Sequence, residues 1–131
     1  MNDRAVRTDK APAPIGPYSQ AIRVPSGSEL LFLSGQIPIR PDTGELITGD
    51  VEAETRLVLA NLTAVLKEAG HTWDDVCKVN VFLKDMGDFL TVNALYAEVV
   101  GNPPPARAAV EVAGLPKGVS VEIELVSAKK V

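Results

Sequence analysis

The chain has almost none of the residues from which metal sites and disulfides are built. Its 131 residues include only one cysteine, one histidine and one tryptophan. A single cysteine excludes a disulfide within the chain, and one cysteine with one histidine cannot supply a structural zinc site. We therefore expect neither a metal nor a disulfide bond to hold this fold together.

Long apolar runs and an excess of positive charge are also missing. No segment approaches the length of apolar sequence that a membrane-spanning helix needs, and residues 1–4 lead into no signal-peptide core. The formal net charge is -4 at pH 7, whereas a dedicated nucleic-acid-binding domain usually carries a basic face. These absences predict a soluble cytoplasmic protein that binds neither membranes nor nucleic acids.

What is present is the patterning of one α+β domain over residues 1–131. Residues 1–17 contain three prolines and predict an irregular N-terminal arm. Short apolar segments between turn residues predict strands over 18–24, 29–34, 76–83, 105–112 and 119–126.

Two helices are expected between these strands. Asp50 is a good N-cap for a first helix that ends at Gly70, with its apolar stripe on one side. A second helix is expected to open at Asp85 and Asp88 and to end before the prolines at 103–105. The order β-β-α-β-α-β-β predicts a mixed sheet with both helices packed on one face.

The second predicted strand raises a question about the other face of this sheet. Residues 30–33 read Leu-Leu-Phe-Leu and are apolar on both sides of the strand. Such runs are expected where both sheet faces are covered, but two helices cover only one. The simplest cover for the second face is another copy of the chain, so we expect an obligate homo-oligomer whose open sheet faces meet.

Two charged residues interrupt the apolar pattern of the last two predicted strands. In the strand over 105–112, alternation places Val110 on one face and Arg107 on the other. In the strand over 119–126, it places Ile123 on one face and Glu122 on the other. If the two apolar faces share the core, Arg107 and Glu122 share the other surface of the sheet. A guanidinium and a carboxylate there could hold a small carboxylic acid and move a proton beside it. The alternative is two solvated charges on an exposed face.

Five short motifs are spread along most of the chain. They are Ile-Gly-Pro-Tyr at 15–18, Ser-Gly-Gln at 34–36, Phe-Leu-Thr-Val-Asn at 89–93, Pro-Ala-Arg at 105–107 and Val-Glu-Ile-Glu at 121–124. In this order and spacing they resemble the RidA (YjgF-type) family of reactive-intermediate deaminases, from about residue 11 to residue 126. The resemblance implies a chorismate-mutase-like α+β fold and a homotrimer with clefts between subunits.

The resemblance also implies an activity and roles for particular side chains. The activity is hydrolysis of 2-imino or enamine acids, such as 2-iminobutanoate and 2-iminopropanoate, to 2-keto acids and ammonia without a cofactor. Arg107 would clamp the substrate carboxylate, Glu122 would orient the water or act as general base, and Tyr18 would hydrogen-bond at the nitrogen end or to the water. The same pocket would be lined by Ser34, Gly35, Asn93 and Ala109.

Each role has a simpler structural alternative. Glu124 lies on the same strand face as Glu122 and could exchange roles with it. Tyr18 could be a packed residue at a strand start, and Asn93 could hydrogen-bond only a neighbouring loop. Ser34 and Gly35 could reflect turn chemistry alone.

The remaining reactive residues are expected to be structural. Many members of the family carry cysteine at the position of Ala109, but hydrolysis of an imine needs no thiol, so we expect the backbone N–H of Ala109 to matter more than its side chain. Cys77 falls on an apolar strand face and is expected in the core, and His71 is expected to be a solvated loop residue. Two other functions stay open: a non-catalytic binding or chaperone-like trimer, and a ribonuclease or translation inhibitor, which the negative charge disfavours.

Overall fold

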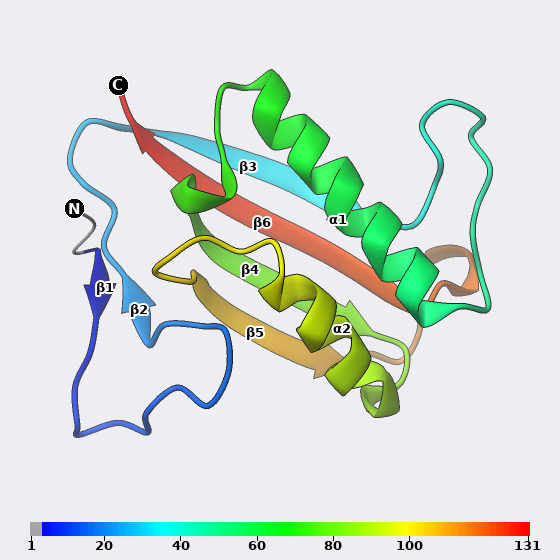
Figure 1. The fold of residues 1–131 in the computed structure, drawn as a ribbon, viewed down its shortest axis with the longest axis horizontal. Helices are drawn as coiled ribbons and strands as arrows, with labels where there is room; N and C mark the ends of the chain where they lie inside the picture. Colours follow the sequence, from blue (N-terminus) through cyan, green and yellow to red (C-terminus); the bar gives the residue numbers. More distant parts are fainter. Residues whose placement is uncertain (1–3) are drawn as a thin grey trace.

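The structure is a computed structural model that describes residues 4–131, and it has a layer of two helices on one face of a four-stranded sheet (Figure 1). The order across the sheet is β3-β6-β4-β5, in which β4 and β5 are parallel and the other neighbours are antiparallel. The strands are β3 (Ser28–Gln36), β4 (Val76–Leu83), β5 (Ala106–Glu111) and β6 (Val121–Lys130). The helices are α1 (Val51–Glu68) and α2 (Phe89–Ala97). The predicted α+β class, with a mixed sheet and both helices on one face, is confirmed.

The hydrophobic core lies between the helices and the sheet. Alternate residues of β6 from Val121 to Leu125 are fully or almost fully buried, and they meet Val58 and Leu62 from α1. Helical periodicity predicts an apolar stripe on α1 that includes Val58, Leu62 and Val65 but not Leu59. In the structure Val65 is exposed and Leu59 is buried. Among residues 4–131, no helix has the length and apolarity required to cross a membrane.

The helix boundaries follow local capping. Asp50 accepts a hydrogen bond from the Ala53 N–H through its side chain, and Gly70 beyond the other end of α1 has a φ of +78° that favours glycine. The prediction that Asp85 and Asp88 open the second helix is confirmed for Asp88, the N-cap residue of α2, and wrong for Asp85. Asp85 instead accepts from the Gly87 N–H and caps a short 3₁₀ turn, η2 (Met86–Asp88), after which α2 begins at Phe89.

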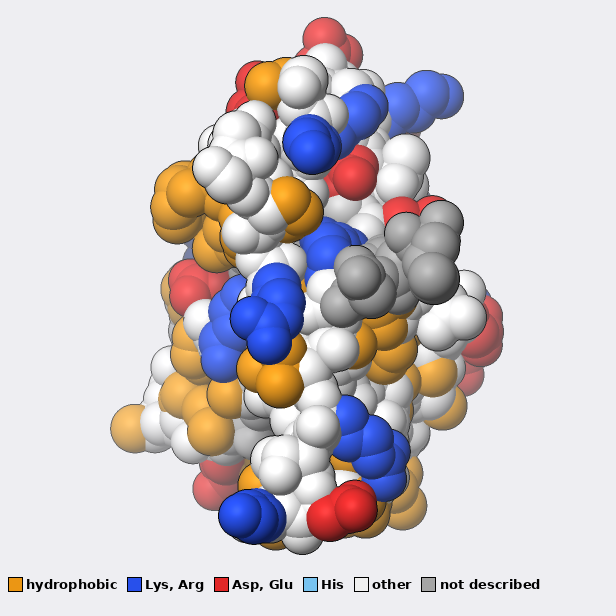
Figure 2. Space-filling model, turned by 90° about the vertical axis from the view of Figure 1, so that its left-hand side faces the viewer, with side chains coloured by type: hydrophobic (Ala, Val, Ile, Leu, Met, Phe, Trp, Pro, Cys, Tyr) orange, Lys and Arg blue, Asp and Glu red, His pale blue; other side chains and the backbone are white. Residues whose placement is uncertain are grey.

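Residues 4–24 differ most from their prediction. A strand over 18–24 is not formed; only β2 (Ala21–Ile22) is extended there, and it pairs with β1 (Ala5–Val6) in a separate two-stranded sheet. Residues 1–3 of the expected arm lie outside the described residues. The Ser19 N–H and hydroxyl donate to the carbonyls of Pro105 and Pro104, so the segment that follows the arm is attached to the residues just before β5. On the end of the molecule seen in Figure 2, basic side chains are interspersed with hydrophobic and uncharged ones.

In the part of the chain that the structure describes, no helix covers the second face of the four-stranded sheet (Figure 1). Three large apolar side chains are exposed on it: Leu30 (50%), Phe32 (72%) and Val110 (46%). Leu31 and Leu33, the intervening residues of β3, pack on the helix side instead. Alternate residues of the apolar run in β3 therefore lie in the core, and the residues between them lie on an open surface.

His71 is not the solvated loop residue that its position after α1 predicted. Its side chain is buried (2% exposed), with Nδ1 2.7 Å from Ser127 Oγ and Nε2 2.8 Å from Glu29 Oε1. These contacts join the loop after α1 to the ends of β3 and β6. Because Ser127 is fully buried, this arrangement presents no nucleophile to a substrate.

Candidate functional site

The strand register places Arg107 on the helix-covered face of the sheet. Arg107 pairs with Val79 of β4, and Val79 is fully buried beneath the helices. Paired residues of neighbouring strands point to the same side of a sheet. The prediction that Val110 faces the core and Arg107 the opposite surface is therefore wrong, because alternation along β5 defines two faces without saying which one the helices cover.

Glu122 lies on the open face. It pairs with Phe82 of β4, which in turn pairs with the exposed Val110 of β5. Within one chain, Arg107 and Glu122 thus point to opposite sides of the sheet. The predicted surface shared by the two residues in a single chain is not formed.

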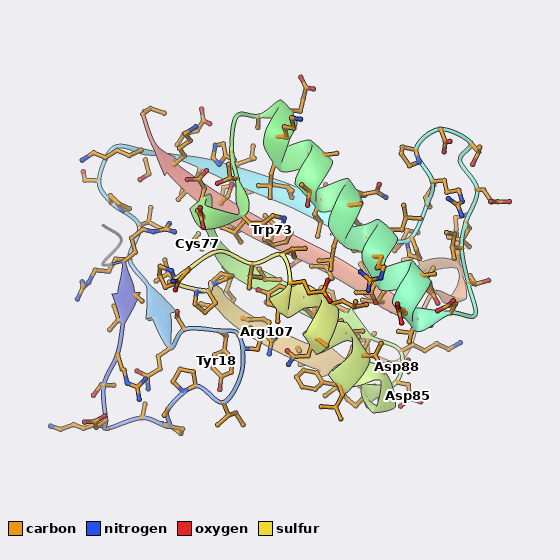
Figure 3. The ribbon with its side chains drawn as sticks, viewed as in Figure 1. Tyr18, Trp73, Cys77, Asp85, Asp88 and Arg107 are labelled. Carbon is orange, nitrogen blue, oxygen red and sulfur yellow. The ribbon has the colours of Figure 1, made fainter. Side chains whose placement is uncertain are left out.

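The Arg107 guanidinium is enclosed by aromatic rings and held by α2. Its Cζ lies 5.6 Å from the ring centroids of Tyr18 and Phe89 and 5.1 Å from that of Tyr96. One of its terminal nitrogens donates to Asn93 Oδ1 over 2.6 Å. Figure 3 shows Tyr18 and Arg107 near each other, to the left of α2. These contacts fix the plane of the guanidinium without neutralising its charge.

Among residues 4–131, Arg107 is a cation without a counter-ion. None of the ion pairs within residues 4–131 includes it, although it is only partly exposed. Burial lowers the pKa of Arg107 from its ordinary value, and the Tyr96 and Tyr18 side chains oppose that shift. Arginine nevertheless stays charged in proteins. A desolvated positive charge among neutral neighbours favours binding of an anion.

Tyr96 forms the inner wall of this environment. Its hydroxyl is buried without a hydrogen-bond partner among the described residues, and burial raises its pKa well above the ordinary value. Tyr96 is therefore a neutral phenol at physiological pH. Its ring, stacked edge-on to Trp73 with centroids 6.3 Å apart, supports the guanidinium from the core side.

The turn at residues 15–18 covers the outer side of the guanidinium. The Tyr18 N–H donates to the Gly16 carbonyl over 2.8 Å, and the Tyr18 hydroxyl accepts from the Ile15 N–H over 3.4 Å. A Cβ at Gly16 would lie 3.7 Å from a terminal nitrogen of Arg107. Gly16, Phe89 and Tyr96 are site residues that the sequence pattern did not predict, although Gly16 and Phe89 fall within the motifs.

Glu122 lies against an irregularity in β3. The β3–β6 register shifts between Leu33 and Gln36, which leaves Ser34 and Gly35 in a bulge. A Cβ at Gly35 would collide with the Glu122 carboxylate. A larger residue at this point would therefore force the Glu122 side chain to move, and the structure brings Ser34, Gly35 and Glu122 together.

Glu122 and Glu124 differ in what they contact. Glu124 Oε2 accepts a hydrogen bond from Asn80 Nδ2 over 3.1 Å. The Glu122 carboxylate makes no hydrogen bond or ion pair with any residue of the described part of the chain. Glu122 is thus available to a water molecule or a ligand, whereas Glu124 is engaged within the sheet.

The predicted site residues fall into two groups on opposite edges of the sheet. The Arg107 cluster (Tyr18, Asn93 and Arg107) lies at edge strand β5, and the Glu122 cluster (Ser34, Gly35 and Glu122) lies at edge strand β3 and its neighbour β6. Ala109 is on the helix side of β5 and packs against the core. Within residues 4–131, no group of three or more His, Cys, Asp or Glu side chains is arranged to hold a metal ion.

Known proteins resemble this chain over nearly its whole length. The family model described as Endoribonuclease L-PSP matches residues 8–129. A RutC family protein of Pyrococcus horikoshii is 53% identical over 94% of this chain and 95% of its own length. The 2-iminobutanoate/2-iminopropanoate deaminase of Mus musculus is 44% identical over 95% of this chain and 90% of its own.

A solved structure agrees with these sequence relationships. TdcF from E. coli, crystallised with bound serine, matches the present structure with a TM-score of 0.70 at 39% identity, covering 98% of this chain and 100% of that one. The fold, the family model and the curated relatives therefore point to the same group of proteins. The chain belongs to the RidA (YjgF-type) family.

Proposed function

We propose that this protein is a hydrolytic deaminase that converts 2-imino acids and their enamine tautomers, such as 2-iminobutanoate and 2-iminopropanoate, to 2-keto acids and ammonia. The observation that carries the proposal is Arg107, a partly buried cation held among aromatic rings with no acidic partner in the described chain. The mouse relative is named for this reaction, and the E. coli relative was crystallised with an amino acid.

Arg107 accounts for selection of a carboxylic acid. A guanidinium can donate two parallel hydrogen bonds to a carboxylate, whereas lysine supplies a point charge. The bond to Asn93 occupies one terminal nitrogen and fixes the orientation of the fork. The substrate carboxylate then supplies the missing counter-ion, and its imine carbon is held at a defined place relative to the arginine.

Glu122 accounts for the hydrolytic step. A water molecule attacks the electrophilic carbon of the protonated imine while Glu122 accepts one proton from the water, which gives a neutral tetrahedral carbinolamine. Glu122 then returns this proton to the nitrogen. The C–N bond breaks and ammonia leaves as the carbinolamine hydroxyl gives its proton to Glu122 and the C=O bond of the keto acid forms. The reaction consumes one water per imine and needs neither a covalent nucleophile nor a redox partner. Tyr18 donates to or accepts from the nitrogen end or the water.

The separation of the two clusters requires more than one copy of the chain. Arg107 and Glu122 point to opposite faces in one subunit, so we propose that the Glu122 cluster of one subunit meets the Arg107 cluster of another. The exposed side chains Leu30, Phe32 and Val110 supply an apolar surface for such an assembly. We propose a homotrimer of the chorismate-mutase-like type, with a site at each junction between subunits.

The activity is tested with imino acids generated in solution by an amino acid oxidase or a threonine dehydratase. We expect the protein to accelerate release of ammonia and keto acid above the rate in buffer, and Arg107→Ala to return it to that rate. Buffer-rate hydrolysis by a well-folded wild type would refute the enzyme and leave a binding module. Sedimentation that shows an active monomer would refute the shared site.

Cleavage of RNA is the second candidate, because the matching family model is described as an endoribonuclease. The formal charge of -4 opposes it. We expect no cleavage of a single-stranded RNA by the preparation that hydrolyses imines. Cleavage that Arg107→Ala leaves unchanged would indicate a separate site or a contaminant.

A further inference from the structure

Helix α1 places a carboxyl group in the hydrophobic core. Glu54 is 0% exposed, on the side of α1 that also carries the fully buried Val58. Its Oε1 accepts the Ser120 N–H over 2.8 Å, but its Oε2 has no hydrogen-bond partner among the described residues. A buried carboxyl oxygen without a partner opposes folding. Packing alone would therefore favour leucine at this position.

The backbone N–H that Glu54 binds belongs to the residue just before β6. Ser120 directly precedes β6, and its carbonyl accepts the Lys84 N–H over 3.0 Å just beyond the end of β4. The turn before it has left-handed backbone at Lys117 (φ 58°) and Gly118 (φ 71°). In Figure 1 the N-terminal end of α1 lies beside this turn. Both backbone groups of Ser120 are thus held, the N–H by the helix and the carbonyl by the neighbouring strand.

We infer that Glu54 is a positioning residue for Glu122, an inference that rests on the deaminase proposed above. Glu122 is two residues after Ser120, and its register with Phe82 is set by how the chain enters β6. On its other side the carboxylate abuts Gly35 with no room for a Cβ. Displacement of a catalytic group by about 1 Å can reduce the rate of reaction by about 10²-fold. The burial of Glu54 costs stability, but the hydrogen bond that Glu54 makes holds Ser120 and thereby the position of Glu122.

Three substitutions of Glu54 distinguish its hydrogen bond to the Ser120 N–H from its packing in the core. Glu54→Gln keeps an oxygen acceptor of the same reach, Glu54→Asp keeps the carboxyl group but shortens the side chain by one methylene, and Glu54→Leu fills the space without an acceptor. We expect kcat to fall at least about tenfold in the Asp and Leu variants and to stay within about threefold of wild type in the Gln variant. KM should change less, because Arg107 lies on edge strand β5, which β4 separates from β6.

Thr55→Val is the matched control. Thr55 is also fully buried on α1, and its hydroxyl donates to the Val51 carbonyl over 2.7 Å, so the substitution removes a buried hydrogen bond without affecting Ser120. We expect it to lower thermal stability while kcat is retained. An equal loss of kcat in Thr55→Val would show that general destabilisation is responsible and would overturn the inference.

A second measurement is independent of activity. Amide hydrogen exchange at Ser120 should be slow in wild type and Glu54→Gln and at least about tenfold faster in Glu54→Asp. If the protein hydrolyses no imine, this measurement still tests the anchor, so failure of the proposed function is distinguished from failure of the inference. Wild-type kcat in Glu54→Asp, or slow exchange at Ser120 in that variant, would overturn it. The Asp and Gln pair suffices if Glu54→Leu does not fold.

Discussion

The Arg107 cluster and the Glu122 cluster differ in how many contacts a single chain provides to the charged group of each. Arg107 has a hydrogen bond to Asn93 and aromatic rings around it, and it needs only an anion. Glu122 has β3 against one side, whereas Ser34 beside it is exposed and no described residue binds its carboxylate. Recognition of a planar carboxylate benefits from a fixed fork, whereas activation of water requires an accessible acceptor. The two environments match these two roles.

The clusters also differ in which part of the chain stabilises them. The Arg107 cluster depends on the N-terminal arm, since Tyr18 is held in place by the bonds from Ser19 to Pro104 and Pro105. The Glu122 cluster depends on the bulge of β3 and on the anchor at Ser120. Substitutions in one cluster should therefore affect binding and those in the other should affect turnover.

Loss of the guanidinium should have the largest effect. Arg107→Ala removes the counter-ion for the substrate carboxylate, and we expect kcat/KM to fall by about 10³-fold, equivalent to about 4 kcal/mol of transition-state stabilisation. Arg107→Lys keeps the charge and loses the fork, so most of this loss should persist. Assembly, measured by sedimentation, should be unchanged. A rescue by lysine to near wild-type kcat/KM would mean that charge alone suffices.

Substitutions in the Glu122 cluster should lower kcat. Glu122→Gln keeps the size of the side chain but cannot accept the proton of water, so we expect kcat to fall by about 10²-fold while ligand affinity persists. Glu124→Gln is the matched control, because Glu124 is engaged by Asn80 and should change kcat by less than about threefold. Steady-state kinetics of the pair measure both. A larger loss in the Glu124 variant would reverse the assignment of the base.

Gly35→Ala tests how closely β3 confines the base. The added Cβ would overlap the Glu122 carboxylate and force it to move, so we expect kcat to fall by about tenfold with little change in KM. Gly114→Ala is the matched control, since a Cβ there meets nothing within 4 Å. Thermal melting should show both variants folded. Wild-type kcat in Gly35→Ala would mean that the bulge does not position Glu122.

Local signals in the sequence were sufficient for much of the fold. The third predicted strand, 76–83, coincides with β4, and the first helix was placed within one or two residues at its ends because Asp50 and Gly70 cap it. The failures come from non-local contacts. His71 is buried because it reaches Ser127 and Glu29, neither of which is near it in sequence.

The same distinction applies to the candidate site. The resemblance placed Arg107, Asn93, Gly35 and Glu122 in one pocket. The structure brings Arg107 to Asn93 and Glu122 to Gly35, but it does not join the two pairs within one chain. The alternation of β5 could not reveal that Arg107 faces the helices, because that depends on pairing with Val79 of β4. Whether the two pairs form one pocket depends on contacts between chains, which a pattern within one chain does not encode.

The smallest effect is expected at Ala109, two residues after Arg107 on the helix side of β5. A cysteine here adds one sulfur atom beside the core, and we expect Ala109→Cys to change the free energy of unfolding by less than about 1.5 kcal/mol and kcat/KM by less than about threefold. Ala108→Cys, which places the thiol at an exposed position on the opposite face, controls for the presence of a thiol. A tenfold gain confined to the Ala109 variant would show that a thiol beside the arginine contributes to the chemistry. Arg107 and Glu122 would then not account for turnover by themselves.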